Sequence, residues 1–289
     1  MSINVWNSYY MTNILKTFFF ALLRGRGLSS LNQTPSKLDQ IDPLHTLLLL
    51  GLGLVASIIN VVAGGGSYLT LPALIFTGLS PGMANGTNRI GILAGNLFSA
   101  AKFARLGQLR KSDLLFFCLP ATLGGLAGAW IATQIDDRSL RVALAVFMLF
   151  GSWTVIRRPP QTQTKTRNPN WSFPMFSGVG LYAGFIQAGT GFFSLAATSF
   201  LGHDLKRGNA IKTLMNLCLT VPALFVFWRQ SLVDWPSGLA LAVGMSLGGL
   251  IGVHVSETAK HESLKKMVAG AILISAFFIV YPLIRGALE

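Results

Sequence analysis

The sequence contains stretches without charged side chains that are long enough to cross a lipid bilayer. No Asp, Glu, Lys or Arg occurs between residues 43 and 88, and the same holds for 114–135, 168–203, 235–256 and 267–284. A spanning helix needs about 20 mostly apolar residues, and lipid forces its backbone to be helical. We therefore predict an all-α integral membrane protein with about eight transmembrane helices.

The placement of the few charges supports a membrane protein. Only 11% of the residues are charged, and the net charge is +13. Basic side chains cluster between apolar stretches, which favours a membrane over nucleic acid as the partner. The clusters are Lys16, Arg24, Arg26 and Lys37, then Lys102, Arg105, Arg110 and Lys111, then Arg157, Arg158, Lys165 and Arg167. Such loops are typically cytoplasmic, so we expect a cytoplasmic N-terminus in the inner membrane.

This pattern divides the chain into four parts. We expect a cytoplasmic tail or interfacial helix at 1–42, a first transmembrane repeat at 43–156, a cytoplasmic linker at 157–173 and a second repeat at 174–289. The expected spans are 44–63, 84–104, 114–134, 140–156, 174–188, 210–228, 235–256 and 265–284. One ambiguity concerns Lys206, Arg207 and Lys212, which fall on the outer side unless the short segment 192–201 helps to cross.

The two repeats share an order of features. Each has a helix, a glycine-rich break, a short apolar helix and a helix with a polar beginning. The breaks contain Gly64, Gly65 and Gly66 in one half and Gly189 and Gly191 in the other. Paired broken helices indicate a transporter's binding site, and their exposed N–H groups suit anions. The alternative is that these glycines only permit close helix packing.

One cation lies beside each break, on a polar helix face. Asn85, Arg89 and Asn96 share a face at helical spacing, as do Asn209, Lys212, Asn216 and Thr220. A lone cation in hydrocarbon costs about 2.5–3.5 kcal/mol, so we expect an anionic substrate to compensate. The alternative is that both cations reach an interface or pair with Asp113 or Asp204. The candidate substrate-binding residues are Arg89, Lys212, Asn85, Thr87, Asn88, Asn209, Asn216, Gln187, Gly64, Gly65, Gly66, Gly189 and Gly191.

Other chemistry is not indicated. The sequence has no metal-ligand spacing, nucleotide loop or catalytic grouping, so we expect no cofactor, no metal and no enzyme. His254 is the one candidate for carrying protons. The expected partners are a small anion and membrane lipid, with a homodimer as a candidate assembly and no nucleic acid.

The chain resembles the TauE/SafE family of sulfite and organosulfonate permeases over about residues 45–285. The similarity rests on the segment from Gly64 to Pro72, on Ala84-Asn85-Gly86-Thr87, on the glycines of the third span, and on the turn from Gly202 to Arg207. The resemblance implies an inner-membrane exporter of sulfite or related anions.

The function we expect from the sequence is secondary transport of a small anion, in the direction of export. A proton-coupled importer of a carboxylate or another anion is an alternative. A membrane scaffold or enzyme without transport is an alternative from another class.

Overall fold

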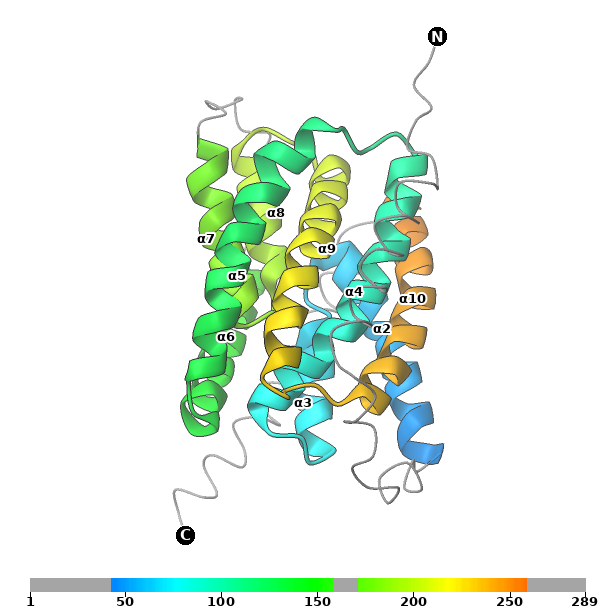
Figure 1. Cartoon of the computed structure of the whole chain (residues 1–289). Helices are drawn as coiled ribbons and strands as arrows, with labels where there is room; N and C mark the ends of the chain where they lie inside the picture. Colours follow the sequence, from blue (N-terminus) through cyan, green and yellow to red (C-terminus); the bar gives the residue numbers. More distant parts are fainter. Residues whose placement is uncertain (1–42, 158–170, 259–289) are drawn as a thin grey trace, which may run out of the picture. The chain divides into compact units, whose positions relative to one another are not determined.

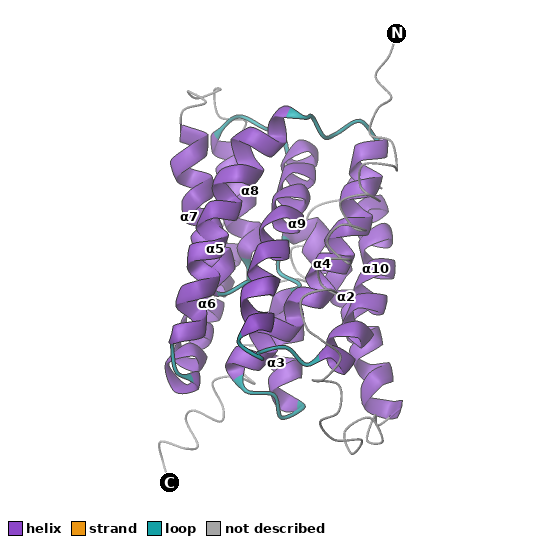
Figure 2. Cartoon of the chain, in the orientation of Figure 1, coloured by secondary structure: helices purple, strands orange, loops and turns teal. Residues whose placement is uncertain are grey.

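The computed structural model describes residues 43–157 and 171–258 (Figure 1). The tail 1–42, the span predicted at 265–284 and most of the linker lie outside the described residues. All regular elements in the described ranges are helical (Figure 2). They are α2 (Pro43–Ala63), α3 (Ser67–Phe76), α4 (Pro81–Arg105), the π-helical turn η3 (Leu114–Cys118), α5 (Leu119–Gln134), α6 (Asp137–Arg157), α7 (Ser172–Phe185), α8 (Thr190–Phe200), α9 (Leu205–Arg229) and α10 (Trp235–Thr258).

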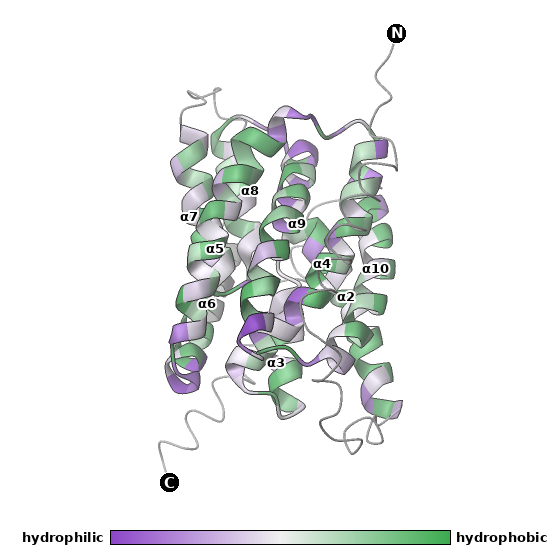
Figure 3. Cartoon of the chain, viewed as in Figure 1, coloured by the Kyte–Doolittle hydropathy of each residue, from purple (hydrophilic) through white to green (hydrophobic). Residues whose placement is uncertain are grey.

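The outer surface of these helices is apolar. Four stretches of the described chain are long and apolar enough to cross a membrane: Pro43–Ala63, Leu114–Gln134, Leu205–Arg229 and Trp235–Thr258. Large side chains such as Leu47, Trp130 and Leu239 are more than half exposed, and Figure 3 shows hydrophobic colours along the helices and hydrophilic colours near their ends. An exposed apolar surface of this extent fits a multi-pass membrane protein.

Helices α2 and α3 form a hairpin that returns to the end where it began. Leu49, near the start of α2, and Leu74, near the end of α3, share a buried cluster with Ala84 of α4 and Ala240 of α10. In Figure 1, α3 lies at the lower end of the helices, where α2 begins. The break between the two helices therefore lies deep among the other helices.

Helices α7 and α8 form a second hairpin, which enters from the opposite end. Phe176 of α7 and His203, just after α8, both contact Phe117, with ring centroids 5.0 and 5.7 Å away. At 14 residues, α7 is about 21 Å long and too short to cross the hydrocarbon. The full span predicted at 174–188 is therefore wrong, because α7 is a half-helix that ends at Phe185.

The hairpins change the topology expected from the charges. Helix α4 runs from the cluster that holds Leu49 to a second cluster that holds Phe103 and Phe117. The start of α2 and the end of α4 are therefore at opposite ends, which contradicts the expected cytoplasmic location of both. The ambiguity at Lys206 and Arg207 is resolved, because α8 returns the chain to the end where α7 begins.

Glycines on α5 and α10 allow close contacts between helices of the two halves. On α5, a Cβ atom added at Gly124 or Gly128 would lie 2.1 or 2.0 Å from a carbonyl oxygen of α7. On α10, one added at Gly244 or Gly248 would lie 2.0 or 2.2 Å from a carbonyl oxygen of α2. Small residues let helix backbones approach closely in lipid. Each half thus packs its glycine-rich helix against the broken helix of the other half.

Candidate functional site

The tips of the two hairpins touch. The backbone N–H of Gly191 donates to the Gly64 carbonyl at 3.3 Å. Gly64 has φ +86° and Gly189 has φ +69°, in the left-handed region that glycine adopts without steric cost. Each break therefore needs its glycine for the turn. The contact joins the two glycine-rich breaks, which the sequence relates to each other only through their matching positions in the two repeats.

Arg89 of the first half binds the C-terminal end of α7 in the second half. Its guanidinium donates to the carbonyls of Gly184 at 2.5 Å and Ala183 at 3.3 Å, and it reaches Gln187 Oε1 at 3.5 Å. It also lies over the Phe227 ring, 4.5 Å from the centroid. The last carbonyls of a helix have no partner within the helix, and a cation there is favoured by the helix dipole.

Lys212 of the second half makes the corresponding contact with α2 of the first half. Its Nζ donates to the Val61 carbonyl at 2.7 Å, to the Asn60 carbonyl at 2.9 Å and to Asn209 Oδ1 at 2.8 Å. The side chain is 1% exposed, and that of Arg89 is fully buried. The two cations therefore form a crossed pair, each holding the carbonyl end of the other half's broken helix.

These contacts overturn the alternatives considered for the two cations. Neither reaches an interface, because both side chains are buried. Asp113 is held by Arg207, 2.5 Å from its Nη2, and Asp204 caps α9 by accepting from the Arg207 N–H at 2.8 Å. Backbone carbonyls of the opposite half hold both cations.

The tips carry donors that the protein leaves available. The N-termini of α3 and α8 have no side-chain cap, and backbone carbonyls accept from the N–H groups of Tyr68, Leu69, Gly191 and Phe192 in their first turns. Tyr68 Oη and Asn88 Nδ2 are buried and have no hydrogen-bond partner among the described residues. Asn88 is oriented by Thr70, whose hydroxyl donates to Asn88 Oδ1 at 2.6 Å. Buried polar atoms without partners are rare, so these donors point to a bound group with acceptor atoms.

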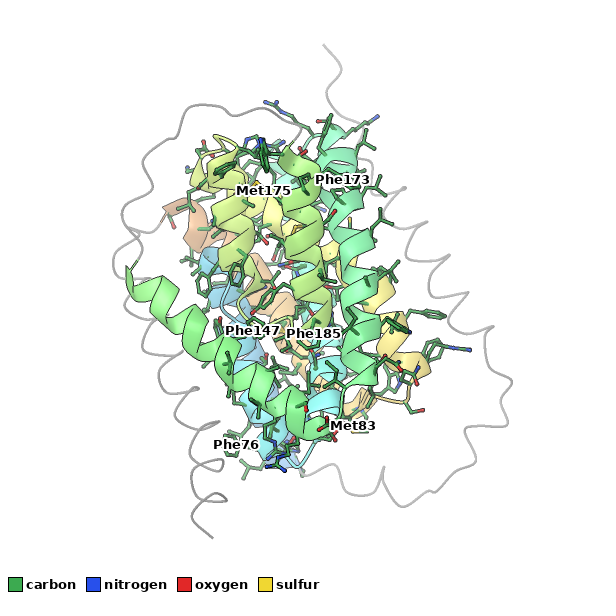
Figure 4. The ribbon with its side chains drawn as sticks, turned by 90° about the vertical axis from the view of Figure 1, so that its left-hand side faces the viewer. Phe76, Met83, Phe147, Phe173, Met175 and Phe185 are labelled. Carbon is green, nitrogen blue, oxygen red and sulfur yellow. The ribbon has the colours of Figure 1, made fainter. Side chains whose placement is uncertain are left out.

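The remaining predicted residues fall into two groups. Gln187 and Asn85 are near the tips: Gln187 donates to Thr220 at 2.6 Å, and Asn85 donates to the Phe185 carbonyl at 2.8 Å. Figure 4 shows Phe185 at the end of α7, where α6 passes obliquely with Phe147. Thr87 instead accepts from the Asp234 N–H in the loop before α10. Asn216 is buried, and its Oδ1 has no partner among the described residues.

Sequence reasoning missed two tyrosines near the tips. Tyr68 packs against Phe192 of the other half, and Tyr182 donates to the Ala188 carbonyl at 2.5 Å in the second break. A hydroxyl-bearing ring beside a glycine break was the available signal. His254 lies on an exposed face of α10, inside the segment expected as a span, and its role as a proton carrier stays a prediction.

A second polar cluster lies at the end where α7 begins. Arg207 bridges Asp113 and the Gln108 carbonyl, and Lys206 pairs with Glu257 at 3.2 Å. Burial, followed by the charge of Arg207, lowers the pKa of His203 below its usual range. Within the described ranges, no group of three His, Cys, Asp or Glu side chains is arranged to hold a metal ion.

Comparison with known proteins gives one family and several relatives. The family described as Sulfite exporter TauE/SafE matches residues 49–279. A probable membrane transporter protein of Haemophilus influenzae is 29% identical over 76% of this chain and 89% of its own length. The probable membrane transporter protein YfcA of Escherichia coli is 26% identical over 84% of this chain and 91% of its own length. No solved structure matches the chain significantly.

Proposed function

Because the chain belongs to the sulfite exporter TauE/SafE family of membrane transporters, we propose that it carries a small anion by secondary transport and binds it where the hairpin tips meet. The observation that carries this proposal is the pair of buried donors Tyr68 Oη and Asn88 Nδ2, which have no partner among the described residues. Backbone N–H groups at a helix N-terminus bind anions readily.

The charge distribution around the tips favours an anion. Each helix end carries about half an elementary charge, negative at the C-termini of α2 and α7 and positive at the N-termini of α3 and α8. These ends offset one another, which leaves the full charges of Arg89 and Lys212. The two cations would thus attract the substrate through space, while their own hydrogen bonds stay on the carbonyls.

The substrate best suited to this site is a sulfur oxyanion or an organosulfonate. Its several oxygens can accept from both Tyr68 Oη and Asn88 Nδ2, the donors without a partner among the described residues. Export is the direction we propose, since an interior-negative membrane drives a monoanion outward by about 2.3 kcal/mol per 100 mV. A proton-coupled importer of a carboxylate remains the second candidate within transport, and a scaffold without transport the candidate outside it.

We also propose the setting of this site. About eight membrane segments in two related halves would surround the tips, with the two hairpins counted among them. The inner membrane is the location that this arrangement fits, with the substrate and lipid as partners. A homodimer is a compatible assembly.

The test is anion counterflow in proteoliposomes with sulfite, sulfoacetate, taurine and common carboxylates. Tyr68→Phe removes one hydroxyl and Asn88→Leu removes one amide, and each should raise the KM for the transported anion. Loss of a hydrogen bond to a charged group costs about 1.5–3 kcal/mol, or tenfold to more than a hundredfold in affinity.

Ser246→Ala is the matched control, since its hydroxyl donates to the carbonyl of Ala242 in its own helix and should leave the KM unchanged. Absence of flux with every anion would refute the transport function. A normal KM in both Tyr68→Phe and Asn88→Leu would refute the location of the site.

A further inference from the structure

We propose that Arg89 and Lys212 are built-in counter-cations that replace a soluble coupling cation, so that transport proceeds without Na⁺. This inference rests on the proposed transport function. It concerns the carbonyl ends of the broken helices, whereas the anion is proposed to bind at the N-terminal ends.

The argument starts from what broken helices usually require. Where a helix stops inside a membrane protein, its last carbonyls form a negative end that must be satisfied. In many secondary transporters such carbonyls coordinate Na⁺ or a proton. Here both ends are already occupied, one by the guanidinium of Arg89 and the other by the ammonium of Lys212.

The contacts of Lys212 resemble those of a bound monovalent cation. Three oxygens surround its Nζ at 2.7–2.9 Å: two carbonyls of α2 and Asn209 Oδ1. An ammonium has three N–H donors, and these three contacts match them. The two carbonyls lie 152 and 151 positions before Lys212 in the chain, so the ammonium also ties one half to the other.

Arg89 occupies the equivalent place by different means. Its planar guanidinium spans the carbonyls of Ala183 and Gly184 and is covered by the Phe227 ring. A guanidinium is more weakly hydrated than an ammonium and stacks on aromatic faces. The two ends therefore differ in the soluble cation that should replace the side chain: guanidinium for Arg89, and Na⁺ or methylammonium for Lys212.

This predicts that deleting a side chain converts the protein into one that needs a soluble cation. In Lys212→Ala the three oxygens remain but the charge is gone. We expect flux in N-methyl-D-glucamine buffer to fall at least tenfold, and Na⁺ or methylammonium to restore most of it. Arg89→Ala should respond to guanidinium in the same way. Lys206→Ala is the matched control, since its side chain is 58% exposed and pairs with Glu257 in the second polar cluster.

Two measurements decide the outcome. Wild-type counterflow should be equal in Na⁺ and N-methyl-D-glucamine buffers, and a tenfold loss without Na⁺ would overturn the proposal. The melting temperature of purified Lys212→Ala should rise with methylammonium or Na⁺, while wild type and Lys206→Ala should not respond. The proposal would also be overturned if methylammonium and Na⁺ failed to raise the melting temperature of Lys212→Ala. The same holds if guanidinium failed to raise the melting temperature of Arg89→Ala.

The melting measurement is independent of flux. It therefore separates failure of this inference from failure of the transport function. If Lys212→Ala does not fold in any buffer, the Na⁺ dependence of wild-type flux and the guanidinium response of Arg89→Ala still decide.

Discussion

A single methyl group at Gly191 tests whether the touching hairpin tips are needed. The Cβ of Gly191→Ala would lie 2.1 Å from the Gly64 Cα, whereas ordinary contacts begin at 3.4 Å. The tips would have to separate by about 1.3 Å, the difference between these distances. The backbone angles of Gly191 lie outside the positive-φ region, so the close approach alone accounts for the effect.

The cost can be worked from these contacts. Overpacking costs about 1–3 kcal/mol, and losing the hydrogen bond from Gly191 to Gly64 costs about 0.5–1.5 kcal/mol. A total of about 2–4 kcal/mol should lower the melting temperature by roughly 5–15 °C on the scale of soluble domains of similar size. Anion flux should fall at least tenfold, because the donors at the tips would no longer converge.

The assay compares thermal unfolding in detergent with counterflow in liposomes. Gly178→Ala is the control: Gly178 lies on α7 with nothing within 4 Å of its added Cβ, so both readings should stay near wild type. If Gly191→Ala behaves like Gly178→Ala in both assays, the contact between the tips does not matter and the reasoning fails.

Three further substitutions test the packing and the polar ends. Gly128→Leu places a side chain against the α7 backbone, and we expect little monodisperse protein in size-exclusion chromatography. Asp204→Ala removes the cap of α9 and should cost about 1 kcal/mol, read as a lower melting temperature. The lowered pKa of His203 means that the unfolded chain takes up its proton first. Stability should therefore fall as the pH drops below about 6.5, and His203→Gln should reduce this loss in melting curves at pH 5 and 7.5.

The sequence predicted helices well because apolar runs and caps are local signals. The segments expected at 84–104, 210–228 and 235–256 are helices at Pro81–Arg105, Leu205–Arg229 and Trp235–Thr258. The hairpins were not predictable in the same way. A charge-free stretch of the right length does not reveal whether the chain crosses or returns, since that depends on contacts such as Phe117 with Phe176 and His203.

The sequence indicated that Arg89 and Lys212 lie beside the glycine breaks, but not which groups they contact. Cations beside glycine breaks identified Arg89 and Lys212, because both residue types are costly in hydrocarbon. Their partners are backbone carbonyls of the opposite half. Because every residue carries a carbonyl, the sequence does not reveal which carbonyls a cation will contact. The binding roles of the predicted residues stay predictions, with Tyr68 added to them and Thr87 placed against the loop before α10.

The crossed cations also bear on how the protein is made. The carbonyls of Asn60 and Val61 find their ammonium 152 and 151 positions later in the chain. During synthesis, the carbonyls at the end of α2 therefore lack the Lys212 ammonium until α9 has emerged from the ribosome. A product that stops before Lys212 would leave these two carbonyls without the ammonium that donates to them.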